Sequence, residues 1–283
     1  MDVEITKQNG DSTRLSDLGI TVRDFVVSSV NVEGIYSEVE GRAGTVDYGA
    51  DFGSRTITVP FYYKASDLHD VPLLRDELFG LVVSSEPFYV REMRRLTYQT
   101  GENLFVGGKR YLVRISGNFD IDQEFKYGFG ELVFETVGLP FAESIGTTQD
   151  IEKNGLRYSQ ELWSYGMGLL YESSSQKYQH RGKTFEIYNA GDVGVHPFEQ
   201  YLSITVDNVA KGYRLLNKTT GEVFEYKGNS TGKLLLNGPN ITLNGLQCFR
   251  DTNRNYISLE SGWNEFEQNM IKNVNFDFRF YYK

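Results

Sequence analysis

Few residues of the chain have the spacing that a catalytic site requires, and the best candidate among them is a serine. The pentapeptide Gly228-Asn229-Ser230-Thr231-Gly232 matches the glycine-x-serine-x-glycine pattern of serine nucleophiles. That pattern needs a strained turn between a strand and a helix. Here Lys233-Leu234-Leu235-Leu236 follows and predicts a second short strand, so we expect Ser230 at the tip of a hairpin. Only an activity that Ser230→Ala abolished would support a hydrolase.

Four acidic residues have the spacing of a calcium-binding loop. Asp120, Asp122, Glu124 and Glu131 occupy its first, third, fifth and twelfth positions. The sixth position needs glycine for a sharp turn, and Phe125 stands there instead. The simpler interpretation is that Asp120, Asp122 and Glu124 share the solvent face of one strand.

Motifs for other metals and for cofactors are missing from the sequence. His69, His180 and His196 lie far apart, and Cys248 is the only cysteine that could join them in a zinc site. Glycine-lysine pairs such as Gly182-Lys183 lack the upstream glycine of a phosphate-binding loop. We therefore predict no catalytic residue, no metal, no cofactor and a protein that is not an enzyme.

Two tryptophans could serve a different chemistry, which is stacking on sugar rings. An exposed indole presents a flat apolar face together with one hydrogen-bond donor. Trp163 and Trp263 are the candidates, and burial in a hydrophobic core is the alternative for both. Saccharide recognition would require Trp163, Trp263 or a loop tyrosine such as Tyr178 to be exposed.

The composition favours strands and excludes several classes of protein. The 283 residues include 19 Tyr, 19 Phe and 29 Gly but only 6 Pro, which is typical of strands joined by tight turns. A single cysteine excludes an intrachain disulfide. We see no secretory signal and no apolar run of membrane-spanning length, so we expect synthesis in a reducing host cytoplasm and no membrane insertion.

The charge is distributed unevenly along the chain. The formal net charge of −9 falls entirely on residues 1–143, whereas residues 144–283 carry acidic and basic residues in equal number. Neither half is expected to carry a basic surface for specific nucleic-acid binding. Because the composition also changes after the turn-rich Gly138–Ser144, we predict two domains, 1–143 and 144–283.

The stretch Glu40–Lys64 organises the first half. Its first part predicts a turn-dense loop, because it contains Gly41, Gly44, Gly49 and Gly53. Its second part, Arg55–Lys64, predicts a strand with Ile57, Val59 and Phe61 on one face.

One amphipathic helix is predicted over Val71–Val83. Its apolar stripe consists of Leu74, Leu78, Leu81 and Val82. Side chains that could cap its start are those of Ser66, Asp67 and Asp70. Further along, Gly107-Gly108 separates two strand-like runs and predicts a hairpin turn.

The second half consists of closely spaced short strands, which predicts a β-sandwich or small barrel. Its last strand, Val274–Tyr282, places Phe276, Phe278, Phe280 and Tyr282 on one face. By contrast, Ile145–Asn154 is polar and shows no clear periodicity. The predicted fold class is therefore mostly β with one amphipathic helix.

A series of short motifs runs through both halves. In the first half they are Gly41-Arg42-Ala43-Gly44, Asp47-Tyr48-Gly49, Gly53–Val59, Gly108–Val113 and Gly138–Ser144. In the second half they are Asn189-Ala190-Gly191, Val195-His196-Pro197, Thr219–Glu222, Ser261–Asn264 and Phe276–Tyr282. In their order and spacing, they resemble the distal tail proteins of long-tailed (siphovirus) bacteriophages over essentially the whole chain.

The resemblance implies a structural protein of the virion. Such proteins have a tail-tube-like N-terminal β domain and a galectin-like C-terminal β-sandwich. They form a hexameric ring at the distal end of the tail, a hub that connects the tail tube to the baseplate and allows DNA passage. The implied partners are further copies of the chain, the tail tube protein, the tail-associated (tail tip) protein, the tape measure protein, and receptor-binding or other baseplate proteins.

An alternative role is that of a carbohydrate-binding baseplate component, which would recognise host cell-wall polysaccharide through the C-terminal sandwich. In a ring, the glycine-rich loop is a natural arm for reaching the next subunit, and charges of both signs could set the register of that contact. The residues predicted to contact the neighbouring subunit are Arg42, Asp47, Asp51 and Arg55.

Overall fold

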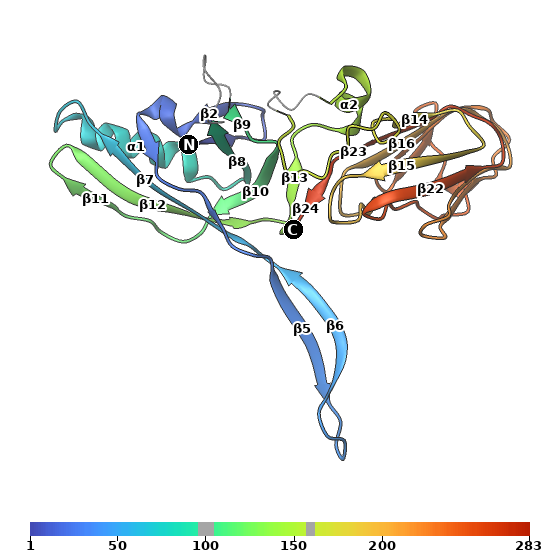
Figure 1. Ribbon diagram of the computed structural model, residues 1–283, viewed down its shortest axis with the longest axis horizontal. Coiled ribbons are helices and arrows are strands. Elements are labelled where there is room, and N and C mark those ends of the chain that lie inside the picture. Colours follow the sequence, from blue (N-terminus) through green and yellow to red (C-terminus); the bar gives the residue numbers. More distant parts are fainter. Residues whose placement is uncertain (96–104, 157–161) are drawn as a thin grey trace. The chain divides into compact units, whose positions relative to one another are not determined.

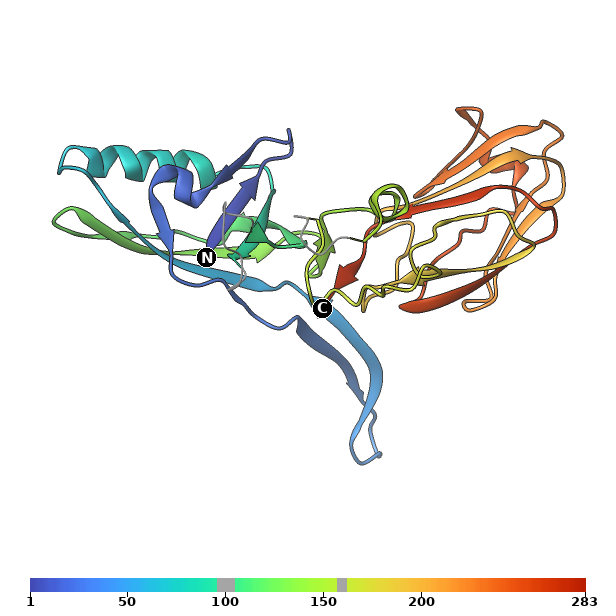
Figure 2. The same ribbon diagram turned by 45° about the horizontal axis from the view of Figure 1, so that its top comes forward.

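The computed structural model describes residues 1–95, 105–156 and 162–283, and its mostly β architecture agrees with the predicted fold class (Figures 1 and 2). The chain forms two compact units, Met1–Ala142 together with Lys283, and Glu143–Tyr282. That residues 1–143 and 144–283 fold as separate domains stays a prediction. Among the described residues, no helix is both long and apolar enough to cross a membrane.

The first unit is built around an antiparallel sheet with the strand order β2-β1-β8-β10-β12-β7-β3. Shorter strands extend it, since β4 pairs with β7, β9 with β8 and β11 with β12. The bounds are β1 Asp2–Thr6, β2 Ser12–Arg14, β3 Ile20–Val22, β4 Val26–Val27, β7 Thr56–Lys64, β8 Phe88–Arg95, β9 Phe105–Val106, β10 Lys109–Ile115, β11 Ile121–Glu124 and β12 Tyr127–Thr136, with a 3-10 turn at Leu15–Leu18.

The predicted strand after the glycine-rich loop is confirmed as β7. Its side chains alternate between the core and the other face, and the buried ones are Ile57, Val59, Phe61 and Tyr63. The neighbouring strand β12 has glycine opposite two of these aromatic residues, at Gly128 and Gly130. A Cβ at Gly130 would lie 2.7 Å from the Phe61 ring. The ring can pack at this position because Gly130 has no side chain.

The predicted helix is confirmed as α1, Asp70–Val82. Leu78, Leu81 and Val82 of its apolar stripe are buried in the core of the sheet, and Leu74 packs against that core. The expected side-chain cap is absent from the residue that precedes the helix, His69. Instead, Asp67 Oδ1 accepts a hydrogen bond from the His69 amide at 2.6 Å, which stabilises the turn that leads into the helix.

The hairpin predicted at Gly107-Gly108 is wrong. Strands β9 and β10 both pair with β8 and not with each other. Gly107 is needed for close approach, because its backbone lies against the Glu92 carbonyl, where a Cβ would clash. Arg91 Nε donates a hydrogen bond to the Gly107 carbonyl at 2.6 Å, which holds this segment against β8.

The second unit contains two antiparallel sheets. One has the order β14-β23-β16-β19-β20-β21 and the other the order β15-β22-β17-β18. Phe266 of the smaller sheet and Phe276 of the larger one have ring centroids 4.9 Å apart, as expected for a sandwich core. The bounds are β14 Gln179–His180, β15 Thr184–Asn189, β16 Leu202–Val209, β17 Tyr213–Asn217, β18 Val223–Tyr226, β19 Gly232–Asn237, β20 Asn240–Leu243, β21 Leu246–Gln247, β22 Gly262–Gln268, β23 Val274–Phe278 and β24 Tyr281–Tyr282, with a 3-10 turn at Phe249–Asp251.

A second helix, α2 at Thr148–Asn154, forms where the sequence showed no periodicity. Its start has a capping box, in which the side chains of Thr147 and Asp150 each bond the other's backbone amide. Thr148 Oγ1 donates to the Phe276 carbonyl at 3.0 Å, so the helix is anchored on β23 by a polar contact. The capping-box residues were the available signal for this helix.

Candidate functional site

The most unusual element of the first unit is a long hairpin that extends beyond its sheet (Figures 1 and 2). It consists of β5, Asn31–Glu38, and β6, Thr45–Gly53, joined by a loop over residues 39–44. Every residue of β5 is exposed, and no residue of β6 is buried. The predicted turn-dense loop over residues 40–53 is therefore mostly a strand, and only its first residues form the turn.

The two strands of the hairpin are bent by a β-bulge. The register shifts between Gly34 and Tyr36, so that Ile35 lies opposite two residues of β6, Tyr48 and Gly49. Gly49 has φ 104°, a conformation that a residue with a side chain rarely adopts. The Asp47 carboxylate accepts a hydrogen bond from the Gly49 amide at 2.9 Å and so supports the bulge.

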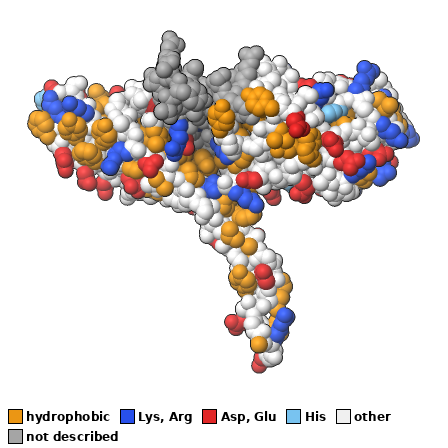
Figure 3. Space-filling view, in the orientation of Figure 1, with side chains coloured by type: hydrophobic (Ala, Val, Ile, Leu, Met, Phe, Trp, Pro, Cys, Tyr) orange, Lys and Arg blue, Asp and Glu red, His pale blue; other side chains and the backbone are white. Residues whose placement is uncertain are grey.

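One face of the hairpin is apolar although it is exposed. Val32 and Phe52 lie directly opposite each other, and Tyr36 follows on the same face. The relative exposure of these side chains is 60% for Val32, 63% for Tyr36 and 48% for Phe52. Figure 3 shows apolar side chains along the projecting arm. Such a contiguous exposed apolar surface is typical of an interaction site.

The opposite face carries an unfavourable pair of charges. Glu33 and Asp51 lie directly opposite each other in the register. Like charges at opposed positions destabilise a strand pair. The nearby Asn31 side chain donates a hydrogen bond to Glu33 at 2.8 Å, but it brings no positive charge. A partner surface that supplies hydrogen-bond donors or cations would therefore stabilise this pair of carboxylates.

The hairpin leaves the sheet at a base that is held by hydrogen bonds. The Ser28 amide donates to the Thr56 carbonyl at 3.0 Å, and the Thr56 amide donates to Ser28 Oγ at 2.9 Å. Phe52 also contacts the Phe141 ring edge to face, with centroids 5.6 Å apart. The strands below the hairpin are therefore fixed to the unit, while the arm itself has no core of its own.

This hairpin lies inside a segment with a known family. Residues 13–136 match the model of the phage tail protein RIFT-related domain. The match covers less than half of the chain, and the hairpin and most of the strands of its sheet lie within the matched segment.

Solved structures extend the likeness over the whole chain. The crystal structure of SPP1 Dit (gp 19.1), described as a paradigm of the hub adsorption apparatus in Gram-positive infecting phages, matches with a TM-score of 0.64 at 14% identity, over 98% of this chain and 99% of that one. This match shows a shared fold and, together with the tail domain, confirms the resemblance to siphophage distal tail proteins. The phage P2 baseplate in its activated conformation with Ca matches at a TM-score of 0.45 and 11% identity over 99% of this chain and 97% of that one. A search of curated proteins finds no match.

The four predicted contact residues of the phage tail domain do not lie together. Arg42 lies in the loop at the hairpin tip, and Asp47 and Asp51 are exposed on β6. Arg55 is 5% exposed and lies below the hairpin, with its guanidinium 5.8 Å from the centre of the Tyr111 ring. Burial raises the pKa of Tyr111, and the Arg55 charge opposes that rise. The prediction for Arg55 is corrected, because its side chain packs inside the unit.

The two tryptophans of the second unit differ in their exposure to solvent. Trp163 is fully buried, with its ring 6.0 Å from that of Phe280, so it has no face for a sugar and that prediction is wrong. Tyr178 is fully buried as well, and burial raises its pKa far above the ordinary value. Trp263 is 38% exposed and packs beside Tyr188 at a centroid distance of 5.0 Å. Only Trp263 of these three is exposed enough to stack on a ligand.

Trp263 forms part of a cleft with a volume of about 310 Å³ at the edge of the sandwich. The lining residues combine one aromatic wall with polar side chains, and they are Ser173, Ser174, Lys177, His180, Thr184, Phe185, Glu186 and Trp263. The His180 ring stacks on Phe185 with centroids 4.9 Å apart and planes at 10°. Burial lowers the pKa of His180, so its imidazole is neutral at pH 7.

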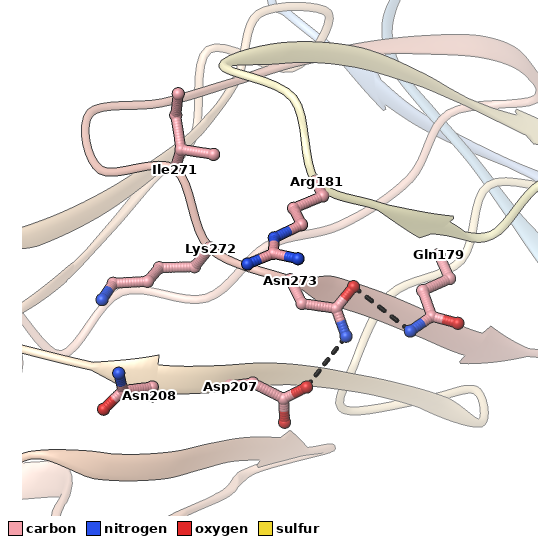
Figure 4. Close-up of a pocket in the computed structure, with 7 residues that line it drawn as sticks. All are labelled: Gln179, Arg181, Asp207, Asn208, Ile271, Lys272 and Asn273. Carbon is pink, nitrogen blue, oxygen red and sulfur yellow. Dashed lines mark hydrogen bonds between the residues drawn. The ribbon is translucent and has the colours of Figure 1, made fainter.

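A second pocket of about 470 Å³ in the same unit is polar throughout apart from Ile271 (Figure 4). Gln179 donates a hydrogen bond to Asn273 at 3.2 Å, and Asn273 donates to Asp207 at 2.8 Å. These bonds fix the orientation of both amides. The cations of this pocket are Arg181 and Lys272, but no aromatic ring lines it. Its chemistry differs from that of the Trp263 cleft.

The serine and acidic motifs lie in ordinary turns and strands. Ser230 stands between β18 and β19, which belong to different sheets, so the expected hairpin around it is wrong. Its carbonyl accepts a hydrogen bond from the Tyr226 hydroxyl at 3.0 Å. Phe125 has φ 56° in the turn between β11 and β12. The segment with the calcium-like spacing is therefore a β-hairpin and not a calcium-binding loop. Within the described residues, no three His, Cys, Asp or Glu side chains are grouped as metal ligands.

Proposed function

We propose that the protein is a structural subunit of the distal end of a phage tail, where it joins the tail tube to the baseplate. The tail-family domain and the fold shared with a hub protein support this role. The observation that carries it is the β5–β6 hairpin, whose apolar face of Val32, Tyr36 and Phe52 is exposed. A two-stranded arm without a core gains its stability from another surface.

The proposed assembly is a ring of six copies. In such a ring the hairpin of one copy lies on the tail domain of the next, so that the apolar face is buried and the Glu33–Asp51 pair meets donors or cations. The subunit would also contact the tail tube, tail tip, tape measure and receptor-binding or other baseplate proteins. No catalytic step is part of this role, and the protein would reside in the virion.

The charge of the first unit suggests how DNA would pass through the ring. The net −9 of residues 1–143 repels the phosphate backbone if these residues surround the channel. We expect purified rings to show no tight binding of duplex DNA. Strong binding that weakens with added salt would contradict an acidic channel.

The ring and the hairpin are tested together by measuring mass in solution. Light scattering of the parent protein should give six times the chain mass of 32.3 kDa. Substituting both Val32→Asp and Tyr36→Asp should leave a folded monomer, because two charges then stand on the apolar face. Val83→Asp is the matched control, since Val83 is 61% exposed but lies at the end of α1.

Two results would contradict these proposals, and they differ. A parent protein that stays monomeric at all concentrations would argue against the ring. A double variant that assembles as the parent does would leave the ring in place but exclude the hairpin from its contacts.

We also propose, as a second function, that the C-terminal unit recognises a cell-surface saccharide. The observation that favours it is the exposure of Trp263 at a cleft with hydrogen-bonding side chains. Binding of the isolated virion protein to an array of bacterial glycans, lost on Trp263→Ala, is the direct test. A galectin-like character of this sandwich is part of the same proposal.

A further inference from the structure

We infer that the Trp263 cleft is a binding site for an uncharged hexose-type saccharide. The inference rests on the second proposed function and names the site and the ligand class that this function would use. It does not depend on ring assembly, because all the residues that line the cleft belong to the second unit.

The aromatic wall of the cleft is held in place from behind. Trp263 and Tyr188 are opposite each other in the register of β15 and β22, and their rings lie at 48° with centroids 5.0 Å apart. The Tyr188 hydroxyl donates a hydrogen bond to the Gly168 carbonyl at 2.9 Å. The indole is therefore fixed on one side while remaining partly exposed on the other. A fixed flat ring suits the apolar C–H face of a sugar, because little side-chain freedom is lost on binding.

The hydrogen-bonding groups around this wall match the hydroxyls of a sugar. His180 Nε2 lies 3.0 Å from the Lys177 carbonyl and donates to it when the imidazole is neutral, which leaves Nδ1 as an acceptor. Ser173, Ser174 and Thr184 supply hydroxyls, and each hydroxyl can donate or accept. A ligand with several hydroxyl groups can satisfy such a mixed set, whereas an apolar ligand cannot.

Glu186 gives the cleft an acceptor that the chain itself leaves open. It lies opposite Glu265 in the register, and Lys218 Nζ bonds Glu265 at 2.9 Å. Among the described residues, the Glu186 carboxylate has no hydrogen-bond or ion-pair partner. Sugar hydroxyls would supply donors to this carboxylate.

The charge and size of the cleft narrow the ligand class. Lys177 and Glu186 are its two charged residues and have opposite signs, so the site favours an uncharged ligand over an acidic polymer. A volume of about 310 Å³ is at the lower end of ligand pockets, which span roughly 300–1,000 Å³. One or two sugar units fit this description better than a long buried chain.

The two tryptophans provide a built-in probe. Because Trp163 is buried and Trp263 is exposed, quenching of fluorescence by acrylamide reports on Trp263. The full-length protein is titrated with glucose, galactose, rhamnose, N-acetylglucosamine and disaccharides of each. We expect at least one of them to protect the fluorescence in a saturable manner. Trp263→Phe also removes the probe and is therefore measured by calorimetry. It should weaken binding less than Glu186→Ala combined with His180→Ala, because phenylalanine keeps an apolar ring.

Two variants separate the cleft from the rest of the unit. Trp263→Ala, followed by calorimetry because it removes the probe, should weaken binding about tenfold or more. Arg181→Ala changes the polar pocket of Figure 4, which has no aromatic wall, and should leave the affinity unchanged. Protection by no sugar in the panel, or equal affinity of Trp263→Ala and the parent, would overturn the inference. Both variants should assemble as the parent does, so a failure of the ring is recorded separately.

Discussion

Strands β6 and β7 are neighbours in the chain, and each has nine residues, yet they lie in opposite environments. Every second residue of β7 is buried in the core, from Ile57 to Tyr63. No residue of β6 is buried, although Tyr48 and Phe52 are as large and as apolar as those of β7. One strand therefore holds the unit together, while the other presents the same kind of side chains to solvent.

The two strands differ in the surface that buries their apolar side chains. Burying a large apolar side chain contributes about 1.5–3 kcal/mol, and β7 obtains this contribution within its own chain. Apart from the contact between Phe52 and Phe141, the hairpin obtains it only by contacting another surface. Substitutions in β7 should therefore change the stability of the monomer, and substitutions in the hairpin should change assembly.

The largest effect is expected from Phe61→Ala. Phe61 is 1% exposed and lies over Gly130, so its removal leaves a cavity in the core. We expect a loss of about 3–5 kcal/mol in the free energy of unfolding of the first unit. Hydrogen exchange of peptides from β7 and β12 measures it, because both tryptophans lie in the second unit and fluorescence would not report this loss.

The matched hairpin variant is Tyr36→Ala. Its ring covers Gly34 but is 63% exposed, so the monomer should change by less than about 0.5 kcal/mol. The mass measured by light scattering should nevertheless fall toward that of the monomer. If Tyr36→Ala destabilised the core as Phe61→Ala does, the contrast between the two strands would be lost.

The sequence predicted β7 and not β6, and the physical reason lies in their patterns. The alternation of Ile57, Val59 and Phe61 with polar residues has the period of a half-buried strand. In β6 the bulge at Tyr48 and Gly49 interrupts that alternation, and Gly49 itself is a turn signal. The apolar face of the hairpin is shared between the two strands, with Val32 and Tyr36 on β5 and Phe52 on β6, so β6 alone shows no alternation that marks it. The glycines therefore predict a projecting arm, but they do not predict β6 as a strand or its pairing with β5.

The next prediction compares two arginines that the sequence analysis placed in one arm. Arg55→Glu introduces a carboxylate at a buried position beside Tyr111, which should cost on the order of 3 kcal/mol. Arg42→Glu changes an exposed residue at the hairpin tip, and it should leave the unfolding of the monomer unchanged. Hydrogen exchange and light scattering on both variants give the two readouts. If Arg42→Glu and Arg55→Glu lost the same stability, Arg42 would have to be buried in the core, which would contradict its exposed position at the hairpin tip.

These arginines also show which part of the candidate site sequence can predict. Arg42, Asp47 and Asp51 are exposed on the hairpin as expected, since glycine-rich segments with charges lie at the surface. Burial of Arg55 and of Trp163 depends on partners distant in sequence, Tyr111 and Phe280. Local spacing holds no information on such contacts. The apolar face of Val32 and Phe52 was missed for the same reason, because it requires the register of two strands.

A smaller effect is expected from Gly49→Ala. At φ 104° a side chain is strained, by about 1–2 kcal/mol, although no atom lies within 4 Å of the position. The strain should straighten the hairpin and weaken assembly severalfold, with β7 unaffected. Ala50→Ser is the control, because Ala50 pairs regularly with Gly34 and tolerates a small side chain. Assembly of Gly49→Ala at parental concentrations would mean that the bend is not needed for the contact.

The smallest effect concerns His180. Its degree of burial is intermediate between that of the exposed hairpin residues and that of the buried residues of β7. Burial lowers its pKa, while the hydrogen bond to the Lys177 carbonyl partly opposes that change. The unfolded chain then takes up a proton near pH 6.5 that the folded unit does not accept, so stability is fully present above that pH and falls as the pH is lowered. Fluorescence-monitored unfolding between pH 7.5 and about 5 measures this in the second unit, which contains both tryptophans. His180→Phe keeps a ring stacked on Phe185 and should remove this part of the pH dependence. If the parent and His180→Phe lost the same stability as the pH was lowered, groups other than His180 would cause the pH dependence. The burial of His180 would then have no measurable effect on stability, as expected for the exposed residues of the hairpin.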